Sequence, residues 1–283
     1  MSAIQAPALV LVTGGTGFLG AAVALRLLQD GFSVRAAIRS ESKLSLFKNR
    51  FQEEIDAGKL TFIVVPDMTI SGAFHEAVKG VDAIVHSASP LIPTDLTVHP
   101  NELIQPAVDI TLRVLEDAAT ALSVKRIVVT SSAVTLLEPH EGKHIYTEVD
   151  WFDSAPKIVE QAGASAPGFL KYMASKVLAE RAAWAWVKEH NPSYELVTVL
   201  PPWIFGKDIF SNPDTIRPGS SNFHLLSAIS KANSRALTEQ EYLATSESVD
   251  LLDAAEAHVR ALTTPAAAGE RIAIKSALLT WQD

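Results

Sequence analysis

Short apolar runs alternate with longer stretches of helical periodicity over roughly the first two hundred residues. The short runs are continuous rather than alternating in polarity, which is typical of parallel strands buried on both faces. The expected strands are Ala8–Thr13, Ser33–Ile38, Leu60–Val65, Ala83–Ser87, Arg126–Ser131 and Glu195–Leu200. The expected helices between them are Phe18–Asp30, Ser42–Ala57, Glu102–Ala121 and Pro167–His190. This alternation predicts βαβ units and therefore an α/β fold, a Rossmann-type doubly wound parallel sheet.

The later part of the chain is less regular. Prolines and glycines break residues 201–222 into loops, and residues 138–168 also lack a clear period, so both segments are expected to be irregular. Two further helices are expected, Asn222–Lys231 and Asp250–Leu262. The pattern predicts a dinucleotide-binding core over residues 1–200, with 138–168 as a loop excursion. Residues 201–283 are expected to form mostly a small C-terminal substrate lobe, with helix 250–262 packing back on the core.

Composition narrows the class of function. The chain has 283 residues and a net charge of 24 − 32 = −8, which argues against a nucleic-acid partner because phosphates require a basic surface. It has no cysteine, so disulfides, cysteine-based zinc sites and thiol nucleophiles are excluded. No apolar run reaches the ~18 residues of a membrane span, and Met1 to Pro7 lacks the pattern of a signal peptide. A cytoplasmic protein with no membrane partner is expected.

A glycine-rich sequence, VTGGTGFLG (residues 12–20), directly follows the first expected strand and opens the first helix. Small residues at this turn let the backbone approach a pyrophosphate, whose charge the helix N-terminus then stabilises. Gly20 allows the helix to pack closely on the strand. The candidate phosphate-binding residues are Gly14, Thr16, Gly17, Phe18 and Leu19.

The residue at the end of the second strand indicates which dinucleotide is bound. An acidic residue there would bind the ribose 2′-hydroxyl of NAD, but this chain has Arg39, followed by Lys43. An arginine can stack on adenine and pair with a 2′-phosphate. The sequence therefore predicts NADPH/NADP+ as the cofactor.

Tyr172 and Lys176 share one face of the helix Pro167–His190, since they are four residues apart. A tyrosine titrates near 10 when unperturbed, and a neighbouring ammonium lowers that pKa and makes the phenol a better proton donor to a carbonyl. Ser132 follows a buried strand and could donate a hydrogen bond to the same carbonyl oxygen. These three residues are the catalytic candidates.

With these motifs in place, the chain resembles the extended (atypical) branch of the short-chain dehydrogenase/reductase family. It is most similar to the dihydroflavonol reductase-like group, which includes fungal and yeast NADPH-dependent carbonyl (aldehyde/ketone) reductases. The similar stretches include VTGGTGFLG (12–20), VHSASP (85–90), RIVVTSSAV (126–134), YMASKVLAERAAW (172–184) and LPPWIFG (200–206). The resemblance implies Ser132, Tyr172 and Lys176 as catalytic residues. It implies cofactor contacts from Asp67, Met68, Ala88, Ser89, Tyr172, Lys176, Pro201 and Ile204. Leu91, Phe169 and Trp203 are candidates for the substrate pocket.

The chain departs from the family pattern at two places. Asp109 stands where relatives commonly have an asparagine beside the catalytic lysine, so an altered proton relay is expected. The chain stops at Asp283, where relatives usually continue, so a more open pocket or one completed by another chain is expected.

A zinc-protease pattern, H-E-x-x-H, is also present at His140 and His144. That chemistry needs both histidines on one helix, whereas Pro139 and Gly142 break any helix here. A solvated loop and no metal site are expected.

These features predict an NADPH-dependent reduction of an aldehyde or ketone to the alcohol, with tyrosine as proton donor and a small-molecule carbonyl compound as partner. Two alternatives are a nucleotide-sugar epimerase or dehydratase with retained NAD, and a catalytically silent dinucleotide-sensing protein. The oligomeric state is left open.

Overall fold

The computed structural model describes residues 3–90, 98–210, 220–229 and 246–279. Its centre is a seven-stranded sheet in the order β3-β2-β1-β4-β5-β6-β9, in which every neighbouring pair is parallel. The strands are β1 (Leu9–Thr13), β2 (Ser33–Ile38), β3 (Leu60–Val64), β4 (Ala83–His86), β5 (Arg126–Thr130), β6 (Glu195–Leu200) and β9 (Arg271–Ala273). The strand order reverses between β1 and β4, which confirms the predicted doubly wound fold.

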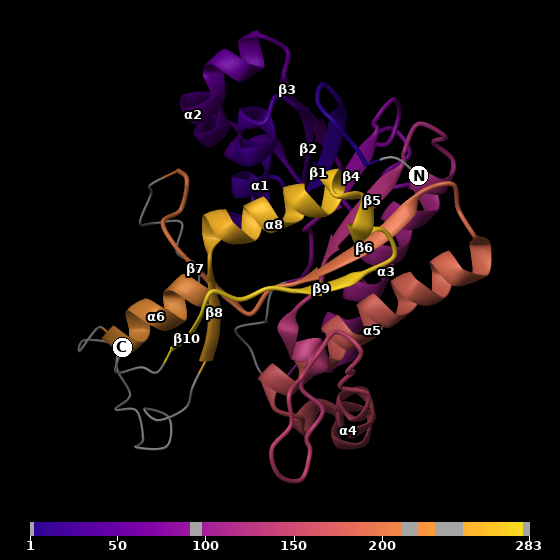
Figure 1. Cartoon of the computed structure of the whole chain (residues 1–283), viewed down its shortest axis with the longest axis vertical. Helices are drawn as coiled ribbons and strands as arrows, with labels where there is room; N and C mark the ends of the chain where they lie inside the picture. Colours follow the sequence, from indigo (N-terminus) through magenta and orange to yellow (C-terminus); the bar gives the residue numbers. More distant parts are fainter. Residues whose placement is uncertain (1–2, 91–97, 211–219, 230–245, 280–283) are drawn as a thin grey trace.

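Helices cover both faces of this sheet (Figure 1). One face packs against α1 (Phe18–Gln29), α2 (Leu44–Asp56) and α8 (Leu251–Thr263). The other face packs against α3 (Asn101–Ala119) and α5 (Gly168–His190). The strands between them are almost wholly buried, as the continuous apolar runs predict.

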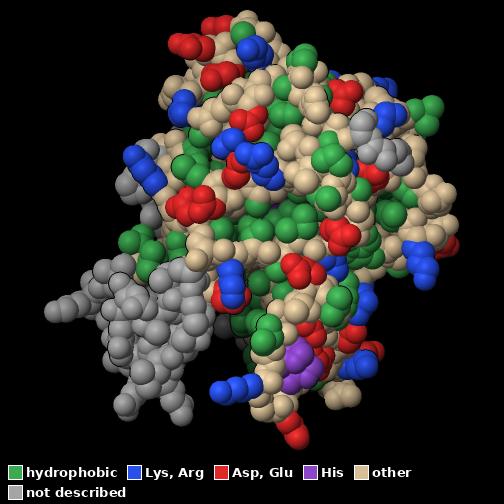
Figure 2. Space-filling view, viewed as in Figure 1, with side chains coloured by type: hydrophobic (Ala, Val, Ile, Leu, Met, Phe, Trp, Pro, Cys, Tyr) green, Lys and Arg blue, Asp and Glu red, His purple; other side chains and the backbone are tan. Residues whose placement is uncertain are grey.

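Residues from the C-terminal part of the chain build a smaller, separate sheet in the order β10-β8-β7. Its strands are β7 (Trp203–Phe205), β8 (Ser246–Asp250) and β10 (Ala277–Leu279), and α6 (Ser221–Ile229) packs near β7. The end of the helix expected over Asn222–Lys231 lies outside the described residues. On the face shown in Figure 2, acidic and basic side chains are interspersed. In the described part of the chain, no helix combines the length and apolar character that a membrane span requires.

Two elements differ from the sequence expectation. Residues 138–168 are not wholly irregular, because α4 (Ser154–Ala162) lies within them and buries Ala155 and Val159 in a local apolar cluster. β9 comes from the segment expected to form loops and lobe, yet it pairs with β6 in the main sheet. Both elements are too short for a clear period, and tertiary packing rather than local pattern determines them.

α8 is tied to the sheet by buried polar contacts. Asp250 caps its first turn by accepting from the Leu252 amide at 2.7 Å. At the other end, the fully buried Arg126 guanidinium donates to the carbonyls of Ala261, Leu262 and Thr264 and pairs with Glu195 at 2.6 Å. A cation at this position also complements the negative end of the helix dipole.

Replacing Arg126 with methionine should lower the free energy of unfolding by about 3–5 kcal/mol, because the change leaves buried carbonyls and a carboxylate without their cation. Urea denaturation measures this loss. Arg26→Met is the matched control, since Arg26 pairs with Asp30 and Glu256 at a side-chain exposure of 35%, and it should cost at most about 1 kcal/mol. Equal losses in the two variants would contradict the anchoring role.

A buried histidine on α8 predicts the pH dependence of stability. His258 Nδ1 donates to the Ala254 carbonyl at 2.7 Å, and its Nε2 accepts from the Thr130 hydroxyl at 2.9 Å. Burial lowers the pKa of His258 to about 4. Between pH 6.5 and 4 the unfolded chain therefore binds a proton that the folded chain does not. The contribution of His258 to the free energy of unfolding is fully present above this window. It decreases by about 1.4 kcal/mol per pH unit as the pH falls through the window.

His258→Gln should remove this contribution and reduce the slope of unfolding free energy against pH between 6 and 4 by about 1.4 kcal/mol per pH unit, while the slope due to the other buried histidine, His86, remains. The exposed His99→Gln is the control for losing an imidazole at the surface. A slope in the His258 variant as steep as that of the wild type would count against the linkage.

Candidate active site

Because the six longer strands are parallel, their carboxyl ends lie along one edge of the sheet, and each is followed by residues that the sequence singled out. Gly14 follows β1, Arg39 follows β2 and Asp67 comes shortly after β3. Ala88 and Ser89 follow β4, Ser131 and Ser132 follow β5, and Pro201 follows β6. The fold thus brings together residues that are up to about 190 positions apart in the chain.

The glycine loop turns sharply between β1 and α1. Gly14 adopts a φ of +67°, and a Cβ there would meet the Ala88 amide nitrogen at 2.9 Å. A Cβ at Gly20 would stand 2.3 Å from the Gly14 carbonyl oxygen, so no side chain fits at this first turn of α1. Gly17 is exposed at the helix N-cap, with no side-chain cap and no acidic residue in the first turn. Such an open helix N-terminus fits an anionic pyrophosphate.

Two charged residues follow β2 and β3 and interact through their charges. Arg39 and Asp67 are both exposed. The pKa of Asp67 is lowered, mainly because its carboxylate accepts from the Thr69 hydroxyl and amide, and also through the charge of Arg39. Met68, expected beside the cofactor, is buried in the apolar core with 8% exposure. The Lys43 side chain lies outside the described residues.

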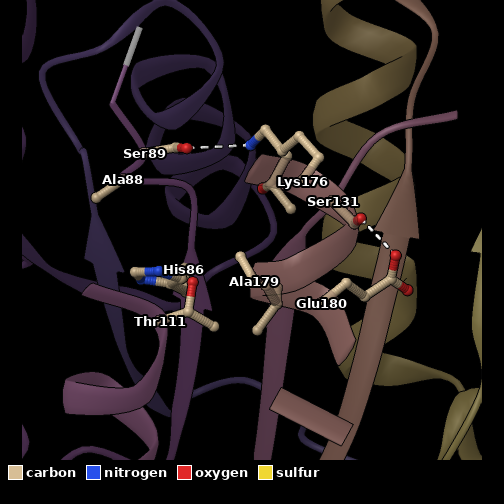
Figure 3. Close-up of a pocket in the computed structure, with 10 residues that line it drawn as sticks. His86, Ala88, Ser89, Thr111, Ser131, Lys176, Ala179 and Glu180 are labelled. Carbon is tan, nitrogen blue, oxygen red and sulfur yellow. Dashed lines mark hydrogen bonds between the residues drawn. The ribbon is translucent and has the colours of Figure 1, made fainter. Parts of the chain in front are cut away.

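The catalytic candidates do come together. Ser132, 6% exposed, caps the short helix η2 (Ala133–Leu136) by accepting from the Val134 amide, and its hydroxyl lies close enough to Tyr172 to act on the pKa of that phenol. Lys176 lies one helical turn beyond Tyr172, with Nζ 5.8 Å from the tyrosine ring centroid. The lysine ammonium donates to Ser89 Oγ at 3.2 Å (Figure 3).

Burial dominates the titration of this group. It lowers the pKa of Lys176 to about 8, while the negative charge of Glu180 opposes the fall. It also raises the pKa of Tyr172, and the neighbouring Ser132 hydroxyl opposes that rise. The lysine therefore carries its charge up to about pH 8 in a site where water is largely excluded.

Glu180 is a residue of this site that the sequence analysis did not identify. Its carboxylate, 1% exposed, pairs with Arg271 from β9 at 2.8 Å and accepts from the hydroxyls of Ser131 at 2.6 Å and Thr198 at 2.8 Å. The spacing Tyr172-x₃-Lys176-x₃-Glu180 places all three on one helical face, which is the sequence signal for it. Arg271 has no such signal, because it is 91 residues away in the chain.

The same helix borders a small buried cavity. Its lining includes His86, Ser89, Thr111, Lys176 and Glu180 (Figure 3). His86 is 2% exposed, as expected for a packed residue at the end of a strand, and burial lowers its pKa to about 3. It is therefore neutral at physiological pH.

Aromatic rings flank Tyr172. Phe169, 42% exposed, stacks at 6.1 Å from Tyr172 and at 6.2 Å from Trp203, and Trp203 stacks on Phe205 at 6.4 Å. Of the substrate-pocket candidates, Phe169 thus lies beside the tyrosine and Trp203 lies on Phe169, whereas Leu91 lies outside the described residues.

Pro201 and Ile204, two of the expected cofactor contacts, lie directly after β6 and in β7. The carbonyl of the buried Pro201 accepts from the Ala133 amide at 2.9 Å, which fixes the loop after Ser132. Ile204 packs against the apolar core cluster on the α1 and α8 side of the sheet.

The H-E-x-x-H pattern lies in a loop between η2 and α4 rather than on a helix. His140 and His144 stack with centroids 3.7 Å apart, and with Asp150 they offer ligand atoms within 4.8 Å of one another. Histidine side chains are visible near the tip of this loop in Figure 2. The absence of a metal site stays a prediction. Asp109 accepts from the Gln105 amide at 2.9 Å and does not line the cavity beside Lys176.

Comparison with known proteins extends these observations. Residues 10–274 match the NAD dependent epimerase/dehydratase family. An uncharacterized oxidoreductase of Schizosaccharomyces pombe is 38% identical over 97% of this chain and 80% of its own length. The ketoreductase adrE of Penicillium rubens is 31% identical over 97% of this chain and 77% of its own length. The crystal structure of Gre2 from Candida albicans in complex with NADPH superposes with a TM-score of 0.83 at 26% identity, covering 98% of this chain and 80% of that one.

The family match spans nearly the whole chain and accounts for the glycine loop, the doubly wound sheet and the Tyr–Lys helix together. The predicted oxidoreductase class and the resemblance to the extended short-chain dehydrogenase/reductases are both confirmed. The chain belongs to the NAD dependent epimerase/dehydratase family.

Proposed function

We propose that this protein reduces an aldehyde or a ketone to the alcohol with NADPH as cofactor. The observation that carries the proposal is the arrangement of Ser132, Tyr172 and Lys176 at the carboxyl edge of the sheet, next to the open N-terminus of α1. The NADPH bound by the Candida albicans neighbour and the ketoreductase among the relatives support it.

The residues around the glycine loop fit the cofactor. The first-turn amides of α1 would hold its pyrophosphate, and the crowded contacts at Gly14 and Gly20 keep that turn free of side chains. Arg39, exposed and beside Asp67, would pair with the adenosine 2′-phosphate. Lys176 and Ser89 would bind the nicotinamide ribose through their polar atoms. NADPH, when bound, supplies the hydride to the carbonyl carbon.

The protein supplies the proton. Tyr172 transfers its phenolic proton to the carbonyl oxygen as negative charge develops there, and the O–H bond of the alcohol forms. Ser132 donates a hydrogen bond to the same oxygen and stabilises it. The ammonium of Lys176 stabilises the phenolate that remains, and in a buried site this attraction is stronger than in water.

The surroundings of Tyr172 favour an apolar or aromatic carbonyl compound. The rings of Phe169 and Trp203 are nearly parallel, at an interplanar angle of 8°. A planar substrate would bury its faces against such rings. Arg39 does not favour the retained NAD of the epimerase alternative.

Tyr172→Phe should lower kcat by at least about a hundredfold, since it removes the proton donor, while the dissociation constant for NADPH changes little. The decrease in absorbance at 340 nm with a panel of aromatic aldehydes, keto esters and diketones measures turnover, and fluorescence titration measures binding. Binding of NADPH without turnover of any compound by the wild-type protein would instead favour the dinucleotide-sensing alternative.

Arg39→Gln should raise KM for NADPH by about tenfold or more and leave KM for NADH nearly unchanged, because only NADPH carries the 2′-phosphate. Initial rates with both cofactors test this directly. Arg35→Gln is a control for removing an arginine from the same strand, since Arg35 donates to backbone carbonyls of Ala77 and Lys79. An equal rise in KM for NADH would show that Arg39 does not bind the 2′-phosphate.

A further inference from the structure

The loop between η2 and α4 brings three side chains that can bind a metal together at the protein surface. His140, His144 and Asp150 each offer one ligand atom, and these atoms lie within 4.8 Å of one another. In the part of the chain that the structure describes, no other histidines and carboxylates form such a group of three. Figure 2 shows histidine side chains exposed near the tip of this loop, with acidic side chains close by. None of the three residues belongs to the catalytic or cofactor candidates described above.

Two of the three ligand atoms already stand at nearly the separation that one zinc ion imposes. His144 Nε2 lies 3.1 Å from Asp150 Oδ1. Ligand atoms that a tetrahedral zinc ion holds at about 2.0–2.2 Å lie about 3.3 Å from one another. The hydrogen bond between these two residues therefore has nearly the length of one edge of a zinc coordination sphere. A zinc ion can take the place of its proton, and the neutral imidazole then carries its hydrogen on Nδ1.

His140 brings a second imidazole against the first. Its ring stacks on the ring of His144, with centroids 3.7 Å apart and an interplanar angle of 24°. Both histidines are exposed, and exposed side chains change rotamer rapidly. Separations of up to 4.8 Å between the ligand atoms can therefore close to the ~3.3 Å that zinc requires, without a change in the core of the protein.

Asp150 is held in the orientation that a metal ligand needs. Its Oδ2 accepts from the amide of Thr147 at 2.7 Å and from the hydroxyl of the same residue at 3.2 Å, so that Oδ1 faces His144. Arg271 donates to the backbone carbonyl of Asp150 at 2.8 Å and fixes the main chain there. Hydrogen bonds of this kind orient the carboxylate ligands of metal sites.

The charge and the donor atoms of the loop indicate which class of ion it would take. Residues 138–150 contain four carboxylates and one lysine, a balance that attracts cations. Two imidazoles and one carboxylate suit zinc and the neighbouring divalent transition metals, whereas calcium and magnesium are bound by oxygen ligands. The chain has no cysteine, so no thiolate competes for the ion.

We propose that His140, His144 and Asp150 bind one zinc ion, with water as the fourth ligand. The sequence expectation of no metal site rested on the lack of a helix that would hold both histidines of a zinc protease. The folded loop instead brings these histidines to a carboxylate outside the H-E-x-x-H pattern, and the proposal revises that expectation. The ion would join the two ends of the loop, and its binding is independent of the proposed carbonyl reduction.

Calorimetric titration of the full chain, without a polyhistidine tag and after treatment with a chelator, tests the site with zinc chloride alone. One zinc ion should bind per chain, and magnesium or calcium chloride should give no heat of binding. In ¹⁵N NMR of the histidines, the ring resonances of His140 and His144 should shift when zinc is added. The resonances of the buried His86 and His258 should stay in place.

Two variants separate coordination from packing. His140→Phe keeps a ring for the stack but offers no nitrogen, and His144→Gln removes the imidazole that contacts Asp150. Each should weaken zinc binding by at least about tenfold, because loss of a ligand costs no less than loss of a group that orients one. His75→Gln is the control, since His75 is an exposed histidine outside this loop. It should bind zinc as the wild type does.

A matched pair at Thr147 tests the orientation of the carboxylate. Thr147→Val removes the hydroxyl that donates to Asp150 Oδ2, and zinc binding should weaken by about tenfold. Thr147→Ser restores the hydroxyl and should return the affinity toward that of the wild type. Equal affinities in the two variants would show that this hydroxyl does not orient the ligand.

An absence of zinc binding to the wild-type protein would overturn the proposal and leave the three side chains as a hydrogen-bonded cluster only. Zinc binding that leaves the ring resonances of His140 and His144 unshifted would overturn it as well, since the ion would then lie elsewhere. Circular dichroism checks that each variant is folded, and the NMR result needs no variant. If the protein reduces no carbonyl compound, the proposed function fails, and these measurements still decide the zinc site.

Discussion

The buried carboxylate of Glu180 joins the parts of the molecule that build the site. It accepts from Ser131 after β5, from Thr198 on β6 and from Arg271 on β9, while its own backbone belongs to α5. A carboxylate this deeply buried persists only when paired and fully hydrogen-bonded. The positions of three strands and one helix are therefore fixed relative to one another within a few ångströms of Ser132 and Lys176.

Arg271 also connects Glu180 to η2 and to the segment before α4. Its guanidinium donates to Thr135 Oγ1 in η2 and to the Glu148 and Asp150 carbonyls, and it lies 3.5 Å from the ring centroid of Trp151. The segment before α4 is in this way attached to the sheet from which Ser132 emerges. The short strand β9 pairs with β6 and places Arg271 opposite Thr198. This pairing brings the arginine to Glu180, although the two residues are far apart in the sequence.

The sequence was most informative where chemistry depends on neighbours in the chain. The glycine loop joins two consecutive elements, β1 and α1, and Tyr172 and Lys176 lie one turn apart on α5. The spacing of these residues in the sequence is therefore enough to predict that they lie close together. The partnership of Glu180 with Arg271 and the contact of His86 with Thr13 join segments more than 70 residues apart. Such contacts follow from strand order and register, which periodicity does not encode.

Lys176 shows how these long-range contacts determine chemistry. Its proposed role needs a positive charge at neutral pH, yet the close packing that keeps water from the tyrosine also disfavours that charge. Glu180 opposes the effect but is itself shared with Arg271, so the field it exerts on the lysine is reduced. The balance leaves the pKa of Lys176 at about 8, close enough to neutrality that a single hydrogen-bond acceptor can shift the protonation of the site. Small polar groups around this lysine, and not the Tyr172–Lys176 pair alone, then determine the pH range in which the tyrosine can donate its proton.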